Sequence, residues 1–534
     1  MTAHRAATGS RSSSDSLRPG TGITRRAFLK RSSKGILAAT LVPAFLGPIT
    51  DRAFAILAAK DATLADYLAH FGVDEEIIQQ VIAEALAQGG DYCDLYFEHT
   101  IGNDISLEDG AVNRASSQID LGVGIRVLKG DQTGYSFTEE ITPEAMKLAA
   151  RTAAGIASSG QQISPVPLVL HPAGDYYPIA TSWEDVAIDQ KMPYLADLNQ
   201  RVAALDPRII KTRVSFSNST SYILIATSEG RAVFDYRPLC RVSVSCIGEQ
   251  GTRREQNGFD LSGRQGIEFL TPENMNLLAT EAVRRTVDLF DAVKPRAGEM
   301  EVVLARGSSG ILLHEAIGHG MEADFNRKGV SIFCDKIGKD VAAPFVSIVD
   351  DGTLPGIRGT LNIDDEGDAT ERTYMVANGM LTSFLHDRVS AEFYKVAPTG
   401  NGRRESFRFM PQPRMRNTFM LAGPHSPEDI IRSVRRGLYA DGFTNGEVNI
   451  GPGDFSFYVK AGRLIENGEL SRPVKDVNVI GNGPQVLRDI VMVGNDLKMA
   501  EGGWTCGKGG QGVPVSQGLP TVKVSKITVG GVNS

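Results

Sequence analysis

From Gly298 to the C-terminus the chain is rich in glycine and carries many short strand-like runs, and this pattern constrains the fold more than any other feature. Two helices are expected in this half, one around His314 and one over Pro427–Tyr439. Short strands separated by turn residues, with few helices, are typical of β-sandwiches and barrels. We therefore predict a β-rich, barrel-like C-terminal domain over residues 298–534. Its expected strands are Met300–Ala305, Phe345–Asp350, Thr373–Asn378, Asn417–Leu421, Val448–Ile450, Asp454–Ala461, Arg463–Glu466 and Thr521–Ile527.

The preceding part of the chain alternates helical and strand-like segments, which indicates an α+β fold class with antiparallel sheets and flanking helices. We expect a first domain over residues 56–170 and a middle domain over residues 180–295. The run Asn218-Ser219-Thr220 is interpreted as a hairpin turn between two strands. The expected helices are Leu64–Gln88, Thr142–Ala157, Met192–Leu205 and Pro272–Val293. The expected strands are Cys93–His99, Asn103–Glu108, Gly122–Lys129, Ile210–Ser217, Ser221–Thr227, Ala232–Tyr236 and Leu239–Gln250.

Charge and hydropathy argue against two classes of partner. The 534 residues have a formal net charge of -7, and the sequence pI is near 5.8. Nucleic-acid-binding domains usually carry a basic surface, which this composition does not favour. No apolar run in the body of the chain reaches the roughly 20 residues that a membrane-spanning helix needs. We therefore predict no nucleic-acid partner and no stable membrane span.

The N-terminus has the pattern of an export signal. Thr24-Arg25-Arg26-Ala27-Phe28-Leu29-Lys30 is similar to a twin-arginine motif, and a moderately apolar stretch follows from Gly35 to Ile49. Ala53-Phe54-Ala55 then offers a small-x-small cleavage site. We interpret residues 1–55 as a twin-arginine signal and expect a periplasmic or other extracytoplasmic bacterial protein. If the signal is not used, the expected location is the cytoplasm.

Residues 314–319 read His-Glu-Ala-Ile-Gly-His and concentrate two imidazoles and a carboxylate in six positions. Two neutral histidines can hold Zn²⁺, and an adjacent glutamate can handle the proton of a water in a hydrolytic site. His314 and His319 are therefore candidate metal ligands and Glu315 is the candidate general base. The apolar residues Ile311, Leu312 and Leu313 are expected to place the segment against a packed interior.

The spacing of the two histidines requires an irregular helix. Five residues rotate two side chains by roughly 140° in a regular α-helix, which would aim them away from a common ion. A local π-type widening, or a helix loosened at Gly318 and Gly320, would bring the rings back together. The alternative is an ordinary helix with one buried and one exposed histidine.

A third protein ligand must come from elsewhere in the chain. Cys506 lies in a glycine-rich segment, and an odd count of five cysteines leaves at least one unpaired within the chain. The other candidates are Cys334, His386, Glu322 and Asp324. The tract Asp364-Asp365-Glu366 could bind a cation, but an exposed turn is favoured, and Asp350-Asp351 is interpreted in the same way.

The glycine-rich segment also matches G-x-G-x-x-G at Gly507, Gly509 and Gly512. We reject a dinucleotide-binding function for it. No strong buried strand precedes the glycines, and Pro514 prevents the helix whose N-terminus would cradle a phosphate.

Many short motifs occur in one order along the chain. They are Ile105-Ser-Leu-Glu-Asp-Gly110, Gly122-Val-Gly-Ile-Arg-Val127, His314-Glu-Ala-Ile-Gly-His-Gly-Met-Glu-Ala-Asp324, Asp364-Asp-Glu-Gly367, Leu385-His-Asp-Arg388, Gly453-Asp-Phe-Ser-Phe457, Ile465-Glu-Asn-Gly468, Gly481-Asn-Gly-Pro484 and Thr505-Cys-Gly-Lys508. Together they resemble the TldD/PmbA (TldD/TldE) family of metallopeptidases, once described as modulators of DNA gyrase. The resemblance covers nearly all of the chain after the signal.

The resemblance implies a zinc-dependent peptidase with His314, His319 and Cys506 as ligands and Glu315 as general base. It also implies an N-terminal α/β part, a β-rich C-terminal domain that bears the metal, and an enclosed cleft that admits extended, unfolded peptides. Members of the family pair, so a homodimer or a heterodimer with a TldE/PmbA-like companion is expected. Because the chain keeps the metal motif, it is similar to the catalytic subunit.

Two other functions remain open at this point. The chain could be a non-catalytic subunit that binds extended peptides or assembles with a companion. It could also hydrolyse a non-peptide amide at the same metal site. The sequence assigns no role to Asp364, Asp365, Glu366 or His386.

Overall fold

The computed structural model describes residues 62–156 and 164–531, and these residues belong to one compact unit. The expected export signal over residues 1–55 lies outside the described residues. The fold is mixed α/β and rich in sheet, as the sequence predicts. Within the described residues, no helix combines the length and the hydropathy that crossing a bilayer requires.

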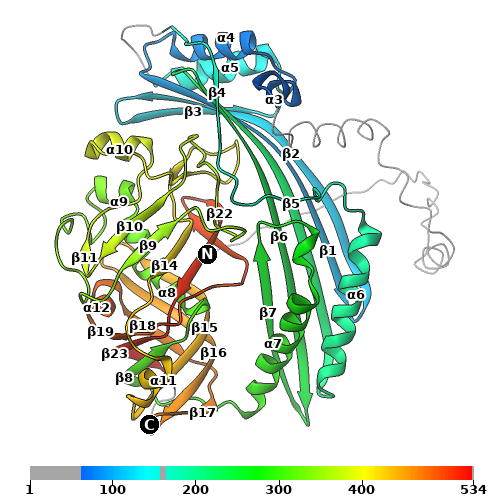
Figure 1. Cartoon of the computed structure of the whole chain (residues 1–534), viewed down its shortest axis with the longest axis vertical. Coiled ribbons are helices and arrows are strands. Elements are labelled where there is room, and N and C mark those ends of the chain that lie inside the picture. The colour runs from blue at the N-terminus through cyan, green and yellow to red at the C-terminus, as the bar shows by residue number, and fades with distance from the viewer. Residues whose placement is uncertain (1–61, 157–163, 532–534) are drawn as a thin grey trace, which may run out of the picture. The chain divides into compact units, whose positions relative to one another are not determined.

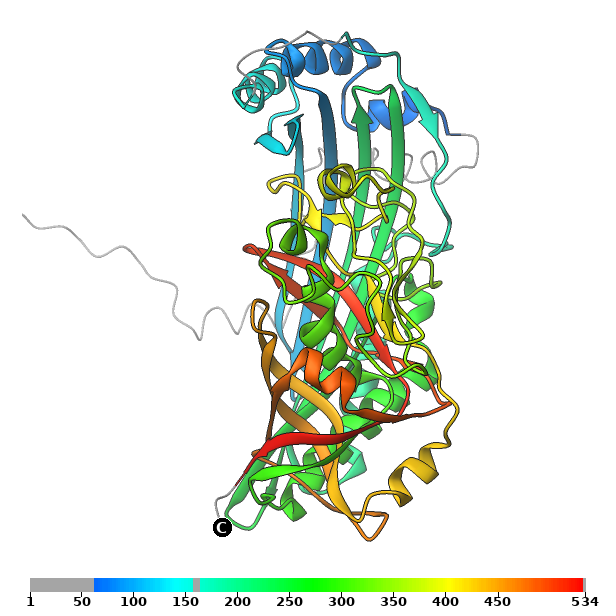
Figure 2. The ribbon, with the colours of Figure 1, turned by 90° about the vertical axis from the view of Figure 1, so that its left-hand side faces the viewer.

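A seven-stranded sheet occupies the N-terminal part, and its long strands run side by side in both views (Figures 1 and 2). The strand order is β3-β2-β1-β5-β6-β4, with β7 paired to β6, and every pair except β4–β6 is antiparallel. The sheet joins strands from the expected first and middle domains. Its strands are β1 (Tyr92–Glu108), β2 (Ala111–Lys129), β3 (Gln132–Thr138), β4 (Val169–His171), β5 (Ile209–Thr227), β6 (Arg231–Gln250) and β7 (Arg253–Gly263).

One face of this sheet is covered by helices at both ends. Leu95 and Phe97 of β1 pack in a core with α3, α4 and α5, whereas Ile105 and Leu107 pack in a second core with α6 and α7 (Figure 1). Alternate residues face the other way, and Tyr96 packs against Ile363 and Phe407 of the C-terminal part. The helices are α3 (Leu64–His70), α4 (Glu75–Leu86), α5 (Pro143–Ala154), α6 (Ile188–Leu205) and α7 (Pro272–Asp291).

Three helices begin directly after a side chain that caps their N-terminus. The side chains of Thr142, Thr271 and Ser426 each accept a hydrogen bond from the third residue of the helix, and each is followed by proline. The expected helix over 64–88 is two helices instead, because Gly72 has a φ of +69° and Asp74 caps a new start.

Several expected turns lie inside continuous strands. The interpretation of Asn218-Ser219-Thr220 as a hairpin turn is wrong, because these residues lie in the middle of β5. Asn218 and Thr220 are buried, and Asn218 accepts a hydrogen bond from Lys191 of α6 at 3.2 Å. The short strands expected over 93–108 and 231–250 fuse in the same way into β1 and β6.

The C-terminal part contains a closed barrel of five strands. The order β15-β8-β23-β18-β16 closes because β15 also pairs with β16, and β17 and β19 extend it. The expected helix over 427–439 ends at Arg432, since Arg436 already begins β15. The elements are β8 (Gly298–Leu304), α11 (Pro427–Arg432), β15 (Arg436–Asn449), β16 (Asp454–Glu466), β17 (Glu469–Pro473), β18 (Asn478–Asn482), α12 (Gly483–Arg488), β19 (Ile490–Val493) and β23 (Val522–Gly530).

A second C-terminal sheet has the order β11-β10-β9-β14-β22-β20, with β21 paired to β22. A helical segment that contains α8 (Ile311–Leu313) lies between this sheet and the barrel (Figure 1). The two C-terminal layers therefore share one core around that segment. The remaining elements are α9 (Ala323–Arg327), β9 (Ile348–Asp351), β10 (Arg372–Ala377), β11 (Met380–Leu381), α10 (Arg388–Tyr394), β12 (Gly402–Arg403), β13 (Gln412–Pro413), β14 (Asn417–Met420), β20 (Lys498–Met499), β21 (Trp504–Lys508) and β22 (Gln511–Leu519).

Candidate metal centre

The helical segment after β8 changes its winding where the histidines occur. Residues Ile311–Leu313 are α-helical and buried, and His314–Gly318 form a π turn. The wider π turn brings residues five apart onto one side. The rings of His314 and His319 lie 5.1 Å apart, centroid to centroid. The predicted π-type widening is confirmed.

Gly318 has a packing function in this segment. Its backbone is helical, with a φ of -59°, so it needs no special conformational freedom. A Cβ atom at this position would lie 2.0 Å from Met415 Sδ. The absence of a side chain therefore allows the π turn to approach Met415. The alternative in which Gly318 loosens the helix is not supported, because its φ is helical.

Cys506 reaches the histidines on a β-hairpin. It lies on β21, which turns into β22 at Gly509 and Gly510, both with positive φ. Its Sγ atom is 3.4 Å from His319 Nε2. Gly507, Gly509 and Gly512 belong to this hairpin and β22 continues from it, so the segment lacks the strand–turn–helix geometry of a dinucleotide-binding loop.

The donor atoms of His314, His319 and Cys506 all lie within 4.8 Å of one another, and all three residues are buried. Both ring nitrogens of His314 are buried without a hydrogen-bond partner. Buried polar atoms without partners cost free energy, and a metal ion would supply the missing partner. Two imidazoles and a thiol are ligands that Zn²⁺ accepts, so this set fits zinc.

The protonation state of the site also favours a cation. Burial opposes a thiolate, but the neighbouring imidazoles outweigh it and hold the pKa of Cys506 well below its usual value. Burial likewise opposes an imidazolium, yet Glu322 and Cys506 raise the pKa of His319 well above its usual value. The thiolate of Cys506 and the carboxylate of Glu322 therefore stabilise positive charge on His319, which lies between them. A metal cation at the donor atoms would be stabilised in the same way.

Glu315 lies beside the donor atoms and also reaches solvent. Its Oε2 atom is 3.7 Å from His319 Nε2, and its side chain is 21% exposed. A carboxylate in this position can exchange protons with a water near the three donors.

The other candidate ligands lie outside this set of donors. Glu322 contacts the far nitrogen of His319, with 3.0 Å between Oε2 and Nδ1, and Asp324 pairs with Lys508. His386 packs against the ring of Tyr394, and Cys334 donates to the carbonyl oxygen of Ser331. Among the described residues, only His314, His319 and Cys506 meet at this place.

The expectation that Asp364-Asp365-Glu366 forms an exposed turn is wrong, because all three residues are buried. Backbone N–H groups of Glu366, Asp368 and Gly402 donate to Asp364. Arginines of the N-terminal sheet pair with the rest of the tract, Arg126 with Glu366 and Arg237 with Asp365. Asp364, Glu366 and Asp368 also lie with their ligand atoms within 4.8 Å of one another, so they form a second group that could hold a cation. The two arginine pairs join the tract to the N-terminal sheet.

Asp350 and Asp351 are also buried, and the expectation of an exposed turn is wrong here too. Both lie on β9. Asp350 pairs with Arg416 at 2.8 Å and Asp351 with Arg372 at 2.6 Å. Each buried carboxylate therefore has a cationic partner that the local sequence does not reveal.

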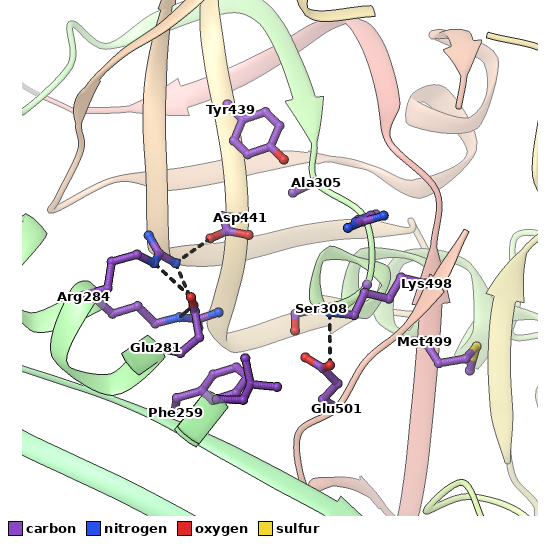
Figure 3. A pocket seen from close by; sticks show the side chains of 14 residues that line it. Phe259, Glu281, Arg284, Ala305, Ser308, Tyr439, Asp441, Lys498, Met499 and Glu501 are labelled. Atoms are coloured by element: carbon purple, nitrogen blue, oxygen red, sulfur yellow. Dashed lines mark hydrogen bonds and ion pairs between the residues drawn. The ribbon is translucent and has the colours of Figure 1, made fainter. Parts of the chain in front are cut away.

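A separate cavity of about 240 Å³ lies between α7 and the barrel (Figure 3). Arg284 contacts Glu281 and Asp441 there, and Lys498 contacts Glu501 at 3.0 Å. The charged groups labelled in Figure 3 thus pair with one another. None of the metal donors lines this cavity, so it is not the candidate catalytic centre.

Three family descriptions match successive parts of the chain. The PmbA/TldA metallopeptidase domain 1 matches residues 93–157, the central domain residues 181–290, and the C-terminal domain residues 297–531. The matched C-terminal domain contains His314, His319 and Cys506.

Two curated relatives align with most of this chain and with nearly all of their own length. A protein of Haemophilus influenzae named metalloprotease TldD homolog is 40% identical over 451 residues, covering 83% of this chain and 93% of its own length. A zinc metalloprotease TldD homolog of Saccharolobus solfataricus is 27% identical, covering 84% of this chain and 99% of its own length.

Solved structures show the same fold at low identity. A Thermotoga maritima protein described as a modulator of a DNA gyrase has a TM-score of 0.70 and 23% identity, covering 85% of this chain and 100% of its own. TldE of Thermococcus kodakarensis has a TM-score of 0.67 and 18% identity, with the same coverage of both chains. The chain belongs to the PmbA/TldD family of metallopeptidases.

Proposed function

We propose that this chain is a zinc-dependent peptidase in which His314, His319 and Cys506 hold the metal. The observation that carries the proposal is their convergence: three buried donors lie within 4.8 Å although Cys506 is 187 residues from His319. The partnerless nitrogens of His314 support it as well. The relative from Saccharolobus solfataricus that is named a zinc metalloprotease agrees with this choice of metal.

Zinc at these donors would act as a Lewis acid, polarising a carbonyl group and making a water more acidic. Glu315 is the base in this proposal. Its carboxylate takes the proton of the attacking water and returns it to the nitrogen of the leaving amine. The exposed part of its side chain gives water and substrate access, whereas burial of the three donors excludes bulk solvent from them.

We further propose that the substrates are unfolded peptides held in an extended conformation. Main-chain hydrogen bonding to a strand edge would give weak sequence preference. The proposed assembly is a homodimer or a heterodimer with a TldE/PmbA-like companion, and the structural likeness to TldE supports pairing within this family. Export through the twin-arginine route remains a proposal based on residues 24–30.

The test compares Glu315→Gln with the wild-type protein and with Glu428→Gln, a change at an exposed position on α11. Zinc content is measured by metal analysis, and cleavage of casein is followed by mass spectrometry. We expect Glu315→Gln to keep stoichiometric zinc and to lose cleavage, while Glu428→Gln keeps both.

Each contrary result excludes part of the proposal. Wild-type protein without stoichiometric zinc would favour a non-catalytic peptide-binding or assembly subunit. Zinc-loaded protein that leaves casein intact but hydrolyses a small amide would indicate a non-peptide substrate. Full cleavage by Glu315→Gln would remove Glu315 from the mechanism.

A further inference from the structure

A buried carboxylate lies on the side of His319 that faces away from Cys506. Glu322 is fully buried, and its Oε2 atom is 3.0 Å from His319 Nδ1. The same oxygen is 3.0 Å from Lys508 Nζ. One oxygen atom therefore joins the imidazole to the ammonium group.

The ammonium group of Lys508 has a complete set of acceptors. Nζ lies 3.0 Å from Glu322 Oε2, 2.7 Å from Asp324 Oδ1 and 2.9 Å from the carbonyl oxygen of Pro413. An ammonium group has three hydrogens to donate, and these three acceptors use them all. The Lys508 side chain is only 6% exposed, so it is held in one position instead of moving freely in solvent.

Cys506 and Lys508 arrive on the same strand. They are two residues apart on β21, and residues two apart on a strand face the same side. The strand therefore places the Cys506 thiol 3.4 Å from Nε2 of His319. It also places the Lys508 ammonium beside the Glu322 carboxylate, which contacts Nδ1 of the same ring. Both sides of one imidazole are fixed by the same short segment.

We propose that Glu322 and Lys508 are positioning residues for His319, an inference that rests on the proposed zinc site. The carboxylate orients the ring through Nδ1 and leaves Nε2 directed at the donor set, as in other metal sites where a carboxylate supports a histidine. Lys508 compensates the buried charge of Glu322 and ties the Cys506 hairpin to the histidine helix. His314 has no such support, since neither of its ring nitrogens has a hydrogen-bond partner.

The proposal predicts the zinc affinity of variants that keep Glu315 and all three donors. Lys508→Met removes the ammonium but keeps most of the side-chain stem, and Glu322→Gln removes the charge without changing the shape. Each should weaken zinc binding about 10- to 100-fold in competition with a chromophoric chelator. Lys508→Arg keeps the charge and should lose less. The control is Lys526→Met, which removes an exposed ion pair with Glu299 and should bind zinc like the wild type.

Two further readouts separate positioning from a general loss of structure. In the cobalt-substituted protein, the ligand-field spectrum should change in Lys508→Met and Glu322→Gln while far-UV circular dichroism stays the same. The two changes should also be non-additive, because they remove one chain of contacts. Wild-type zinc affinity in both variants would overturn this inference alone, whereas a wild-type protein that binds no zinc would overturn the proposed site with it.

Discussion

Replacing Arg126 tests whether its buried ion pairs hold the N-terminal sheet and the C-terminal part together. Arg126 lies on β2, donates from Nε to Asp94 of β1 at 2.7 Å, and contacts Glu366 of the C-terminal part at 2.5 Å. All three side chains are at most 2% exposed. Arg126→Met keeps an apolar stem of similar length and leaves two buried carboxylates without their shared cation.

The expected loss of stability is large. At these distances and an effective dielectric constant near 20, each ion pair contributes roughly 6 kcal/mol of gross attraction. The cost of desolvating the ions offsets most of this, and removing one partner of a buried pair costs about 3–5 kcal/mol. Asp94 retains only a 3.5 Å contact with Arg404, and Glu366 retains one backbone donor, the N–H of Arg388. We therefore expect Arg126→Met to lower the free energy of unfolding by about 3–5 kcal/mol.

Urea unfolding followed by circular dichroism measures this loss. The matched control is Arg432→Met on α11, which breaks an exposed pair with Asp429 and should change stability by less than about 1 kcal/mol. Combining Arg126→Met with Glu366→Gln should recover part of the loss, since Glu366 then carries no buried charge, whereas Asp94 keeps its contact with Arg404. If Arg126→Met is as stable as Arg432→Met, the proposed junction contributes nothing and the reasoning is refuted.

Three further outcomes follow from the structure. Burial raises the pKa of Glu98 to about 7 despite hydrogen bonds from Thr100 and Phe407, so the folded protein holds a proton that the unfolded chain releases between about pH 4.5 and pH 7. Stability should fall by roughly 3 kcal/mol as pH rises through this window, and Glu98→Gln should flatten that slope in unfolding midpoints measured from about pH 4 to pH 8. Gly318→Ala places a Cβ atom 2.0 Å from Met415 Sδ and should lower the free energy of unfolding by about 1–3 kcal/mol. Adding Met415→Ala should restore part of this loss. An unchanged unfolding midpoint in Gly318→Ala would contradict the packing function of Gly318. Zinc at a free concentration of 100 times its dissociation constant should stabilise the fold by about 2.7 kcal/mol. Chelator-treated protein should therefore unfold at a lower urea concentration than zinc-loaded protein. Identical urea unfolding curves for the two samples would argue against a specific site.

Local pattern predicted the parts of the fold whose causes are local. The helices expected over Thr142–Ala157 and Pro272–Val293 form as α5 and α7, and the glycine-rich half forms a barrel and a second sheet. Strand ends were predicted less well. Asn218 and Thr220 resemble turn residues, yet they lie within β5, where the strand pairs with β1 and β6 and Lys191 of α6 donates to Asn218.

The sequence by itself determined the family, the two histidines with Glu315 between them, and the need for an irregular turn to bring those histidines together. Only the tertiary structure decided that Cys506 lies 3.4 Å from His319 and that Glu322 and Lys508 support the opposite side of the ring. It also decided that Asp364, Asp365 and Glu366 are buried. The physical reason is that burying a charged or polar side chain costs free energy unless partners compensate it, and here many partners come from distant segments. Sequence spacing indicates which residues share one face of a helix or strand, but it does not indicate which faces pack against each other in the fold.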